Sequence, residues 1–94
     1  MTKWLKDKRD KILEITRKYG ARRVRVFGSL AKGMDSKNSD LDLLVEMESG
    51  RSLLDIVAIK QDLEELLGRK VDVVTEAAIS KYIRQDVLKE AVNL

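Results

Sequence analysis

Two aspartates, Asp40 and Asp42, are separated by one residue where an apolar run begins. In a β-strand, residues i and i+2 point to the same face, so these carboxylates should stand side by side. The neighbouring Leu41, Leu43 and Val45 would then point the opposite way, into a core. Two carboxylates 4 Å apart repel by roughly 4 kcal/mol at an effective dielectric constant near 20. A fold tolerates such a pair when a cation lies between them or when a pKa is raised, and we interpret the pair as a divalent-metal site.

A third aspartate, Asp72, lies between Val71 and Val73 in another short apolar run. Phosphoryl or nucleotidyl transfer can use two divalent ions about 3.5–4 Å apart, and holding them takes two or three rigidly placed carboxylates. Neighbouring strands can supply such carboxylates. We therefore predict that Asp40, Asp42 and Asp72 are both metal ligands and catalytic residues. The alternative is a set of unrelated acids that face water.

A glycine and a serine, Gly28 and Ser29, follow the apolar run that ends at Phe27. A turn of this kind presents backbone N–H groups and a hydroxyl to phosphate oxygens, and a glycine lets the backbone approach closely. We predict that Gly28 and Ser29 bind a nucleoside triphosphate. The alternative is a plain strand-to-helix turn in which Ser29 is the N-cap. For Ser39 two roles stay open, contact with the nucleotide or capping of a turn.

Several chemistries are excluded by residues that the chain lacks. It has no histidine and no cysteine, so disulfides, thiolate zinc sites and histidine general bases are impossible. A metal site must then use oxygen ligands, which favours Mg²⁺ or Mn²⁺. The 19 basic residues exceed the 16 acidic ones by only three. This balance, without a basic stripe interleaved with aromatic residues, does not favour direct binding of nucleic acid.

The length of 94 residues indicates one small domain over 1–94. No secretory signal and no run of about 20 apolar residues is present in the sequence, so we expect a cytoplasmic protein without a membrane segment. The periodicity predicts helices over 3–19, 29–33, 52–67 and 79–92, strands over 22–27, 40–46 and 70–75, and a turn over 34–39. The expected fold is α/β (α+β), a small mixed sheet of three strands or slightly more with helices on one face.

Local signals fix several helix ends in this prediction. Thr2 is a candidate N-cap, Ser52 and Asp55 have the spacing of a capping box, and Gly68 is a candidate stop. The helix over 52–67 is expected to bury an apolar stripe made of Leu53, Ile56, Val57, Leu63 and Leu67.

The other face of the sheet is expected to stay open and to carry charged side chains. In the strand over 22–27, Val24 and Val26 would face the core, so Arg23 and Arg25 would share the open face with the three aspartates. Balance of the aspartate charges is the favoured role for these arginines. Contact with phosphate or with an acceptor is the alternative.

These motifs resemble those of a known family. The sequence Gly28-Ser29-x-Ala31-Lys32-Gly33, followed by Ser39-Asp40-x-Asp42-Leu43, is similar to the signature of the polymerase-β-type nucleotidyltransferase superfamily, and more narrowly of its minimal nucleotidyltransferases. The resemblance covers nearly the whole chain, including the run Tyr82-Ile83-Arg84-x-x-Val87-Leu88-x-Glu90-Ala91-Val92. It implies a nucleotidyltransferase-like fold, two Mg²⁺ ions on the three acids, and a third acid that helps to activate the attacking hydroxyl. Lys32 stands where many relatives have arginine, so the bidentate geometry of arginine is lost at that position.

The resemblance also implies a partner. Many minimal nucleotidyltransferases are antitoxins that transfer AMP from ATP to a tyrosine of a HEPN-domain ribonuclease toxin. The implied function is therefore a Mg-dependent protein adenylyltransferase. The alternative is a non-catalytic nucleotide-binding module that neutralises its partner by binding. Self-association is a further expectation, because a sheet this small leaves edge strands to be covered.

Overall fold

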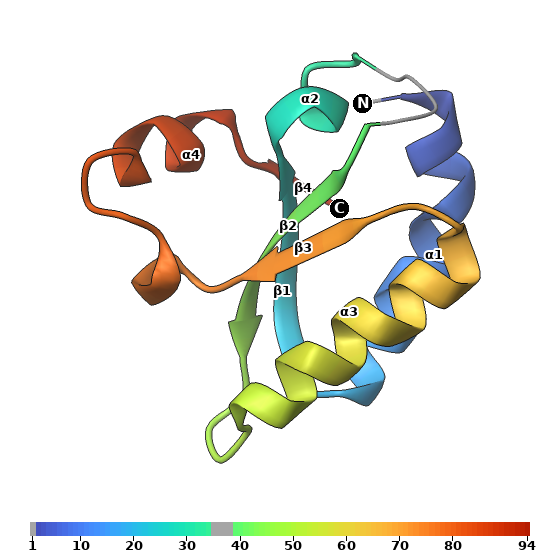
Figure 1. Cartoon of the computed structure of the whole chain (residues 1–94), viewed down its shortest axis with the longest axis vertical. Coiled ribbons are helices and arrows are strands. Elements are labelled where there is room, and N and C mark those ends of the chain that lie inside the picture. The colour runs from blue at the N-terminus through green and yellow to red at the C-terminus, as the bar shows by residue number, and fades with distance from the viewer. Residues whose placement is uncertain (1, 35–38) are drawn as a thin grey trace.

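The computed structural model describes residues 2–34 and 39–94 (Figure 1). Its elements, in chain order, are helix α1 (Lys3–Lys18), strand β1 (Ala21–Phe27), the short helix α2 (Gly28–Ala31), strand β2 (Leu41–Met47), helix α3 (Leu53–Leu67), strand β3 (Val71–Val74), the 3-10 turn η1 (Glu76–Ala78), helix α4 (Arg84–Glu90) and strand β4 (Val92–Asn93). Most of the turn predicted over 34–39 lies outside the described residues. Among the described helices, none has the length and apolar character needed to cross a membrane.

The strands form one mixed sheet in the order β3-β2-β1-β4. Strand β1 runs antiparallel to both β2 and β4, and β2 runs parallel to β3. A parallel pair needs a crossover connection, which α3 provides. The predicted mixed sheet is confirmed.

The fourth strand corrects the predicted helix over 79–92. The observed helix α4 begins only at Arg84 and ends at Glu90, after which Val92 and Asn93 pair with Val26 and Arg25 of β1. The next residue donates a further backbone hydrogen bond, from Leu94 N to Val24 O at 3.0 Å. Pairing with β1 and burial of Leu94, which is 8% exposed, favour an extended end over another helical turn.

Helices α1 and α3 cover one face of the sheet, as predicted (Figure 1). The alternating residues Leu41, Leu43 and Val45 of β2 are buried there, which confirms their predicted direction. The residues of α3 that are fully buried in this core, Ile59 and Leu63, lie beyond its first turn and a half. The predicted stripe was therefore wrong at its start: Leu53 is 72% exposed and Val57 is 40% exposed, because the first turns of α3 extend beyond the core.

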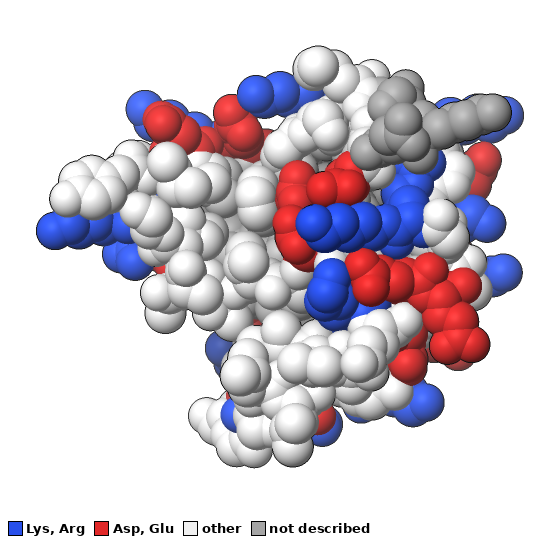
Figure 2. All heavy atoms as spheres, viewed as in Figure 1, with Lys and Arg blue, Asp and Glu red and all other residues white. Residues whose placement is uncertain are grey.

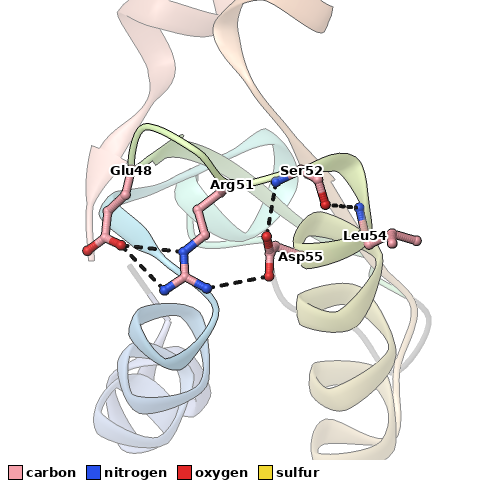
Figure 3. Close-up of polar contacts among 5 residues, drawn as sticks. All are labelled: Glu48, Arg51, Ser52, Leu54 and Asp55. Atoms are coloured by element: carbon pink, nitrogen blue, oxygen red, sulfur yellow. Dashed lines mark hydrogen bonds and ion pairs between the residues drawn. The ribbon is translucent and has the colours of Figure 1, made fainter.

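The predicted capping signals are confirmed. The hydroxyl of Thr2 accepts a hydrogen bond from Leu5 N, and Gly68 ends α3 in the left-handed conformation. At the start of α3, Ser52 Oγ accepts from Leu54 N at 3.2 Å, and Asp55 Oδ2 accepts from Ser52 N at 3.0 Å (Figure 3). The guanidinium of Arg51 joins Asp55 to Glu48 across the preceding loop (Figure 3). These contacts fix the angle at which α3 leaves β2.

The second face of the sheet is only partly open, which corrects the expectation of an uncovered face. A second apolar cluster forms where η1 and α4 pack on it, around Leu44, Ile79 and Val87. Phe27 and Val74 join this cluster. The reason lies in the strand alternation, because Leu44 and Val74 share a face with Asp42 and Asp72. Apolar side chains in those positions need a cover, so α4 closes one part of the face and leaves the acidic part accessible.

Candidate functional site

Asp42 and Asp72 lie directly opposite each other on the neighbouring parallel strands β2 and β3. Both side chains are partly buried, and the two carboxyl groups are hydrogen-bonded. Asp40 precedes β2, and its charge is close enough to act on Asp42. The structure therefore brings Asp42 and Asp72 into contact, with Asp40 near enough for its charge to act on Asp42.

The proximity of these acids changes the protonation of Asp42. Burial raises the pKa of Asp42 to about 6, and the charges of Asp72 and Asp40 and the hydrogen bond to Asp72 act in the same direction. The ammonium of Lys70 opposes them. Near pH 6 about half of the Asp42 carboxyl groups therefore carry a proton. This is the raised pKa expected of close carboxylates when no cation separates them.

The donor set fits Mg²⁺ or Mn²⁺ in its chemistry. Carboxylate oxygens are the ligands these hard ions prefer, and the raised pKa of Asp42 marks a place where positive charge would be stabilised. In the part of the chain that the structure describes, no three acidic side chains are already gathered in metal-binding geometry. Asp40, Asp42 and Asp72 would hold the ions once their carboxylates turn from each other toward the metal.

Gly28 places the turn after β1 directly against Asp42. Its φ is +74°, a conformation that residues with a Cβ rarely adopt. A Cβ at this position would also collide with Oδ2 of Asp42. The cause is the register, because Phe27 pairs with Asp42 and the chain then turns over that carboxylate. The missing Cβ thus lets the backbone approach Asp42 closely, and the contact of Gly28 with a triphosphate stays a prediction.

Ser29 lies inside α2 and is not its N-cap. Helix α2 begins at Gly28, and Phe27 occupies the N-cap position. The alternative that made Ser29 an N-cap was therefore wrong. The fully buried Leu30 anchors this short helix in the core, so Gly28 and Ser29 are held at the edge of the acidic site.

Ser39 closes the approach to Asp40. Its Oγ donates a hydrogen bond to Met34 O at 3.3 Å, and its carbonyl oxygen accepts one from Arg69 at 3.3 Å. The guanidinium of Arg69 also stacks on the ring of Trp4, 3.8 Å from its centroid. Of the two roles left open for Ser39, the turn contact is present in the structure, and the nucleotide contact stays a prediction. Sequence reasoning missed Arg69, since no motif includes it.

Lys32 forms an ion pair with Glu90, with Nζ and Oε1 3.1 Å apart. This pair joins the end of α2 to the last residue of α4. The ammonium of Lys32, at a position where many relatives have arginine, is thus paired with a carboxylate of the same chain. A phosphate bound beside α2 would compete with Glu90 for it.

Arg23 of β1 pairs with a glutamate and not with the aspartates of the site. Because β1 and β2 are antiparallel, Phe27 lies opposite Asp42, whereas Arg25 lies opposite Leu44 and Arg23 opposite Glu46. Arg23 pairs with Glu46 at 3.5 Å. The predicted partners were therefore wrong for Arg23, and its charge is balanced at the opposite end of the strand.

Figure 2 shows acidic and basic side chains gathered near the middle of the face that Figure 1 presents, beside a wide uncharged surface. Three carboxylates beside a glycine turn can hold cations and anionic phosphates together, which is the arrangement that nucleotidyl transfer requires.

Comparison with known proteins agrees with this geometry. Residues 9–94 match the family described as Nucleotidyltransferase domain. A chain of Methanocaldococcus jannaschii provisionally named a protein adenylyltransferase is 44% identical over 84 residues, which are 89% of this chain and 90% of that one. The protein adenylyltransferase MntA of Thermococcus cleftensis is 38% identical over 79 residues, or 84% of this chain and 80% of that one.

Solved structures show the same fold. One, provisionally named a minimal nucleotidyltransferase, superposes with a TM-score of 0.84 at 48% identity and covers 96% of this chain and 92% of that one. Another is the MNT antitoxin of Shewanella oneidensis in complex with a tri-AMPylated HEPN toxin. It has a TM-score of 0.71 at 20% identity, and the match covers 94% of this chain and 69% of that one. The chain therefore belongs to the nucleotidyltransferase domain family, in its minimal nucleotidyltransferase branch.

Proposed function

We propose that this nucleotidyltransferase transfers AMP from ATP to a tyrosine of a HEPN-domain partner, in a Mg²⁺-dependent reaction, and thereby acts as an antitoxin. The observation that carries the proposal is the convergence of Asp42 and Asp72 from adjacent strands under the Gly28 turn. We expect the reaction to take place in the cytoplasm.

Each residue of the site has a distinct role in this proposal. Asp40, Asp42 and Asp72 would hold two Mg²⁺ ions, and bound Mg²⁺ would supply positive charge to offset the triphosphate and the charge that develops during transfer. Gly28 and Ser29 bind the phosphate tail through backbone N–H groups and the hydroxyl, and Ser39 lies at the edge of the nucleotide. The carboxylate of Asp72 accepts the proton of the attacking tyrosine hydroxyl. Asp72 suits this role because it lies on the strand next to Asp42, beside the proposed metal site.

The choice of acceptor is supported by the relatives. The Thermococcus cleftensis relative is named a protein adenylyltransferase, and the Shewanella oneidensis complex contains an AMPylated HEPN toxin beside its MNT antitoxin. A protein acceptor also suits the large apolar side chains that the structure exposes, among them Leu54, Tyr82 and Ile83, because apolar surface favours contact with another protein.

The experiment uses labelled ATP, Mg²⁺ and the protein encoded beside this chain. Wild-type protein is compared with the Asp40→Ala, Asp42→Ala double variant, with label transfer and toxin neutralisation measured in parallel. We expect the double variant to lose label transfer and neutralisation together. Unchanged label transfer would contradict the proposed site. Full neutralisation without label transfer would show instead that the chain silences its partner by binding alone.

A further inference from the structure

A cavity of about 300 Å³ lies at the corner between α1, the start of β1 and the end of the chain. Four arginines line it, Arg9 and Arg17 from α1 and Arg22 and Arg23 from β1. Its apolar floor is formed by the buried Leu13 and Val24. Arg23 and Phe27 are four residues apart, so the cavity lies about 13 Å along β1 from the acidic site.

A β-bulge places two consecutive arginines on the same cavity. Ala21 pairs with Met47 and Arg23 pairs with Glu46, so Arg22 is an extra residue in β1. In a regular strand Arg22 and Arg23 would point to opposite faces. A bulge redirects a side chain, and here both Arg22 and Arg23 line one cavity. The sequence alone gives no sign of this, because it shows only adjacent arginines.

The end of the chain holds two of the four guanidinium groups in place. Arg9 Nε donates to Leu94 O at 3.0 Å, and Arg23 Nε donates to Asn93 Oδ1 at 3.2 Å. Each contact uses the Nε of its arginine and so restricts the orientation of the guanidinium group, whose Nη1 contacts an acidic side chain. Such preorganisation lowers the entropy lost when a ligand binds.

The acids nearby balance only half of this charge. Arg9 pairs with Asp10 at 3.3 Å and Arg23 pairs with Glu46 at 3.5 Å. Glu14 borders an adjoining depression together with Arg17 but forms no ion pair with it within the described residues. Among the described residues, Arg17 and Arg22 likewise have no ion-pair partner. Arg17 and Arg22 therefore bring to this cavity two positive charges that no described acidic side chain pairs with.

We propose that this cavity is an anion site that binds a phosphate group, separate from the nucleotidyltransferase site. Phosphate oxygens match the forked N–H groups of arginine, and a phosphate can contact several guanidinium groups at once. A single carboxylate carries less charge and fewer acceptor oxygens. The apolar floor suits a ribose or base attached to the phosphate. The phosphate can come from a small compound or from an RNA backbone.

The test follows backbone amide shifts by NMR in buffer with EDTA, so that the acidic site binds no metal–nucleotide complex. One arm adds inorganic phosphate and the other adds a single-stranded oligoribonucleotide. We expect the amides of Arg22, Arg23 and Asn93 to shift in the phosphate arm or in both arms. Tighter binding of the oligoribonucleotide assigns the site to RNA, and equal or weaker binding assigns it to a small phosphate compound.

The variant Arg17→Gln, Arg22→Gln should weaken binding about tenfold or more, since charge-assisted hydrogen bonds are lost. The control Lys81→Gln, Lys89→Gln removes the same charge from exposed positions at α4 and should change affinity less than about twofold. AMP transfer should remain in both variants, because neither touches the acidic site. An equal loss of binding in both variants, or a glutamate-rich peptide that competes as well as phosphate, would overturn the proposal.

Discussion

Asp42 is the residue on which the other site residues converge. The carboxyl of Asp72 is hydrogen-bonded to Asp42, and the negative charge of Asp40 raises the pKa of Asp42. The turn at Gly28 lies against Oδ2 of Asp42. Each of these contacts makes the ionised form of Asp42 less favourable or restricts its position. The apo protein therefore carries an electrostatic strain at the place where cations are proposed to bind.

The first prediction concerns this strain. The pKa of Asp42 in the folded protein, about 6, exceeds its ordinary value of 3.8. The folded state therefore binds a proton more tightly than the unfolded state, and stability falls as the pH rises from about 4 to about 6. In EDTA at pH 7, Asp42→Asn should raise the free energy of unfolding by about 1 kcal/mol, a value discounted for solvent screening.

Urea unfolding from pH 4 to pH 8 measures this effect. The variant should lose the decrease in stability between pH 4 and pH 6. The control Asp86→Asn, at an exposed position of α4, should keep the wild-type profile. A variant less stable than wild type at pH 7 would show that the ionised Asp42 carboxylate contributes favourably to the fold.

The second prediction uses two glycines with similar backbones. Gly28 has a φ of +74° and Gly50 has a φ of +86°, but only at Gly28 would a Cβ meet another residue. Both changes to alanine should cost about 1 kcal/mol for the positive φ. Gly28→Ala should cost more and should also reduce AMP transfer, because it displaces Asp42. Both variants are compared with wild type by thermal unfolding and by label transfer. If Gly28→Ala and Gly50→Ala lost the same stability and the same label transfer, this role of Gly28 would be contradicted.

At the scale of elements, side chains of α3 form hydrogen bonds with the backbone at the outer edge of strand β3. Glu64 Oε2 accepts from Val71 N at 3.0 Å, and Lys60 Nζ donates to Val71 O at 2.8 Å. Lys60 and Glu64 also pair with each other at 2.9 Å. The backbone of Val71, the residue before Asp72, is thus fixed by a helix and not by a further strand. This contact holds the third acid in register with Asp42.

The third prediction tests that contact. The Val71 N–H bond and the Lys60 ammonium lower the pKa of Glu64, so its contribution to stability is present near neutral pH and is lost as the pH falls through that lowered pKa. Glu64→Ala should speed hydrogen exchange at β3 and reduce AMP transfer through Asp72. Glu65→Ala, at the exposed neighbouring position, is the control. Unchanged exchange at β3 in Glu64→Ala would show that α3 does not hold this strand.

At the scale of the whole molecule, periodicity and capping signals predicted most elements. The alternation of Leu41, Leu43 and Val45 sufficed to place Asp42 on the opposite face, and the bracketing valines did the same for Asp72. The sequence could not show that β4 would replace the end of the last helix, because that choice depends on pairing with a strand more than sixty residues earlier. Leu44 and Val74 lie on the same face of the sheet as Asp42 and Asp72. Apolar residues at these positions indicated that part of this face would be covered, as it is by α4.

Side-chain partners were harder to predict than strand directions. Arg23 forms an ion pair with Glu46 because the antiparallel register places the two residues opposite each other. The register between these two strands could not be predicted from local residue spacing. The contacts of Arg69 with Trp4 and Ser39 also join segments that are distant in the sequence. Local spacing therefore could not predict them. The bulge at Arg22 also depends on its partner strand.

The central claim is that Asp72 completes one transfer site with Asp40 and Asp42. The most direct test is the single-turnover rate of AMP transfer from labelled ATP to the partner protein, with Asp72→Asn compared with wild type. We predict a loss of about a hundredfold or more, with thermal stability maintained. A rate within a few-fold of wild type in a folded Asp72→Asn variant would contradict the account.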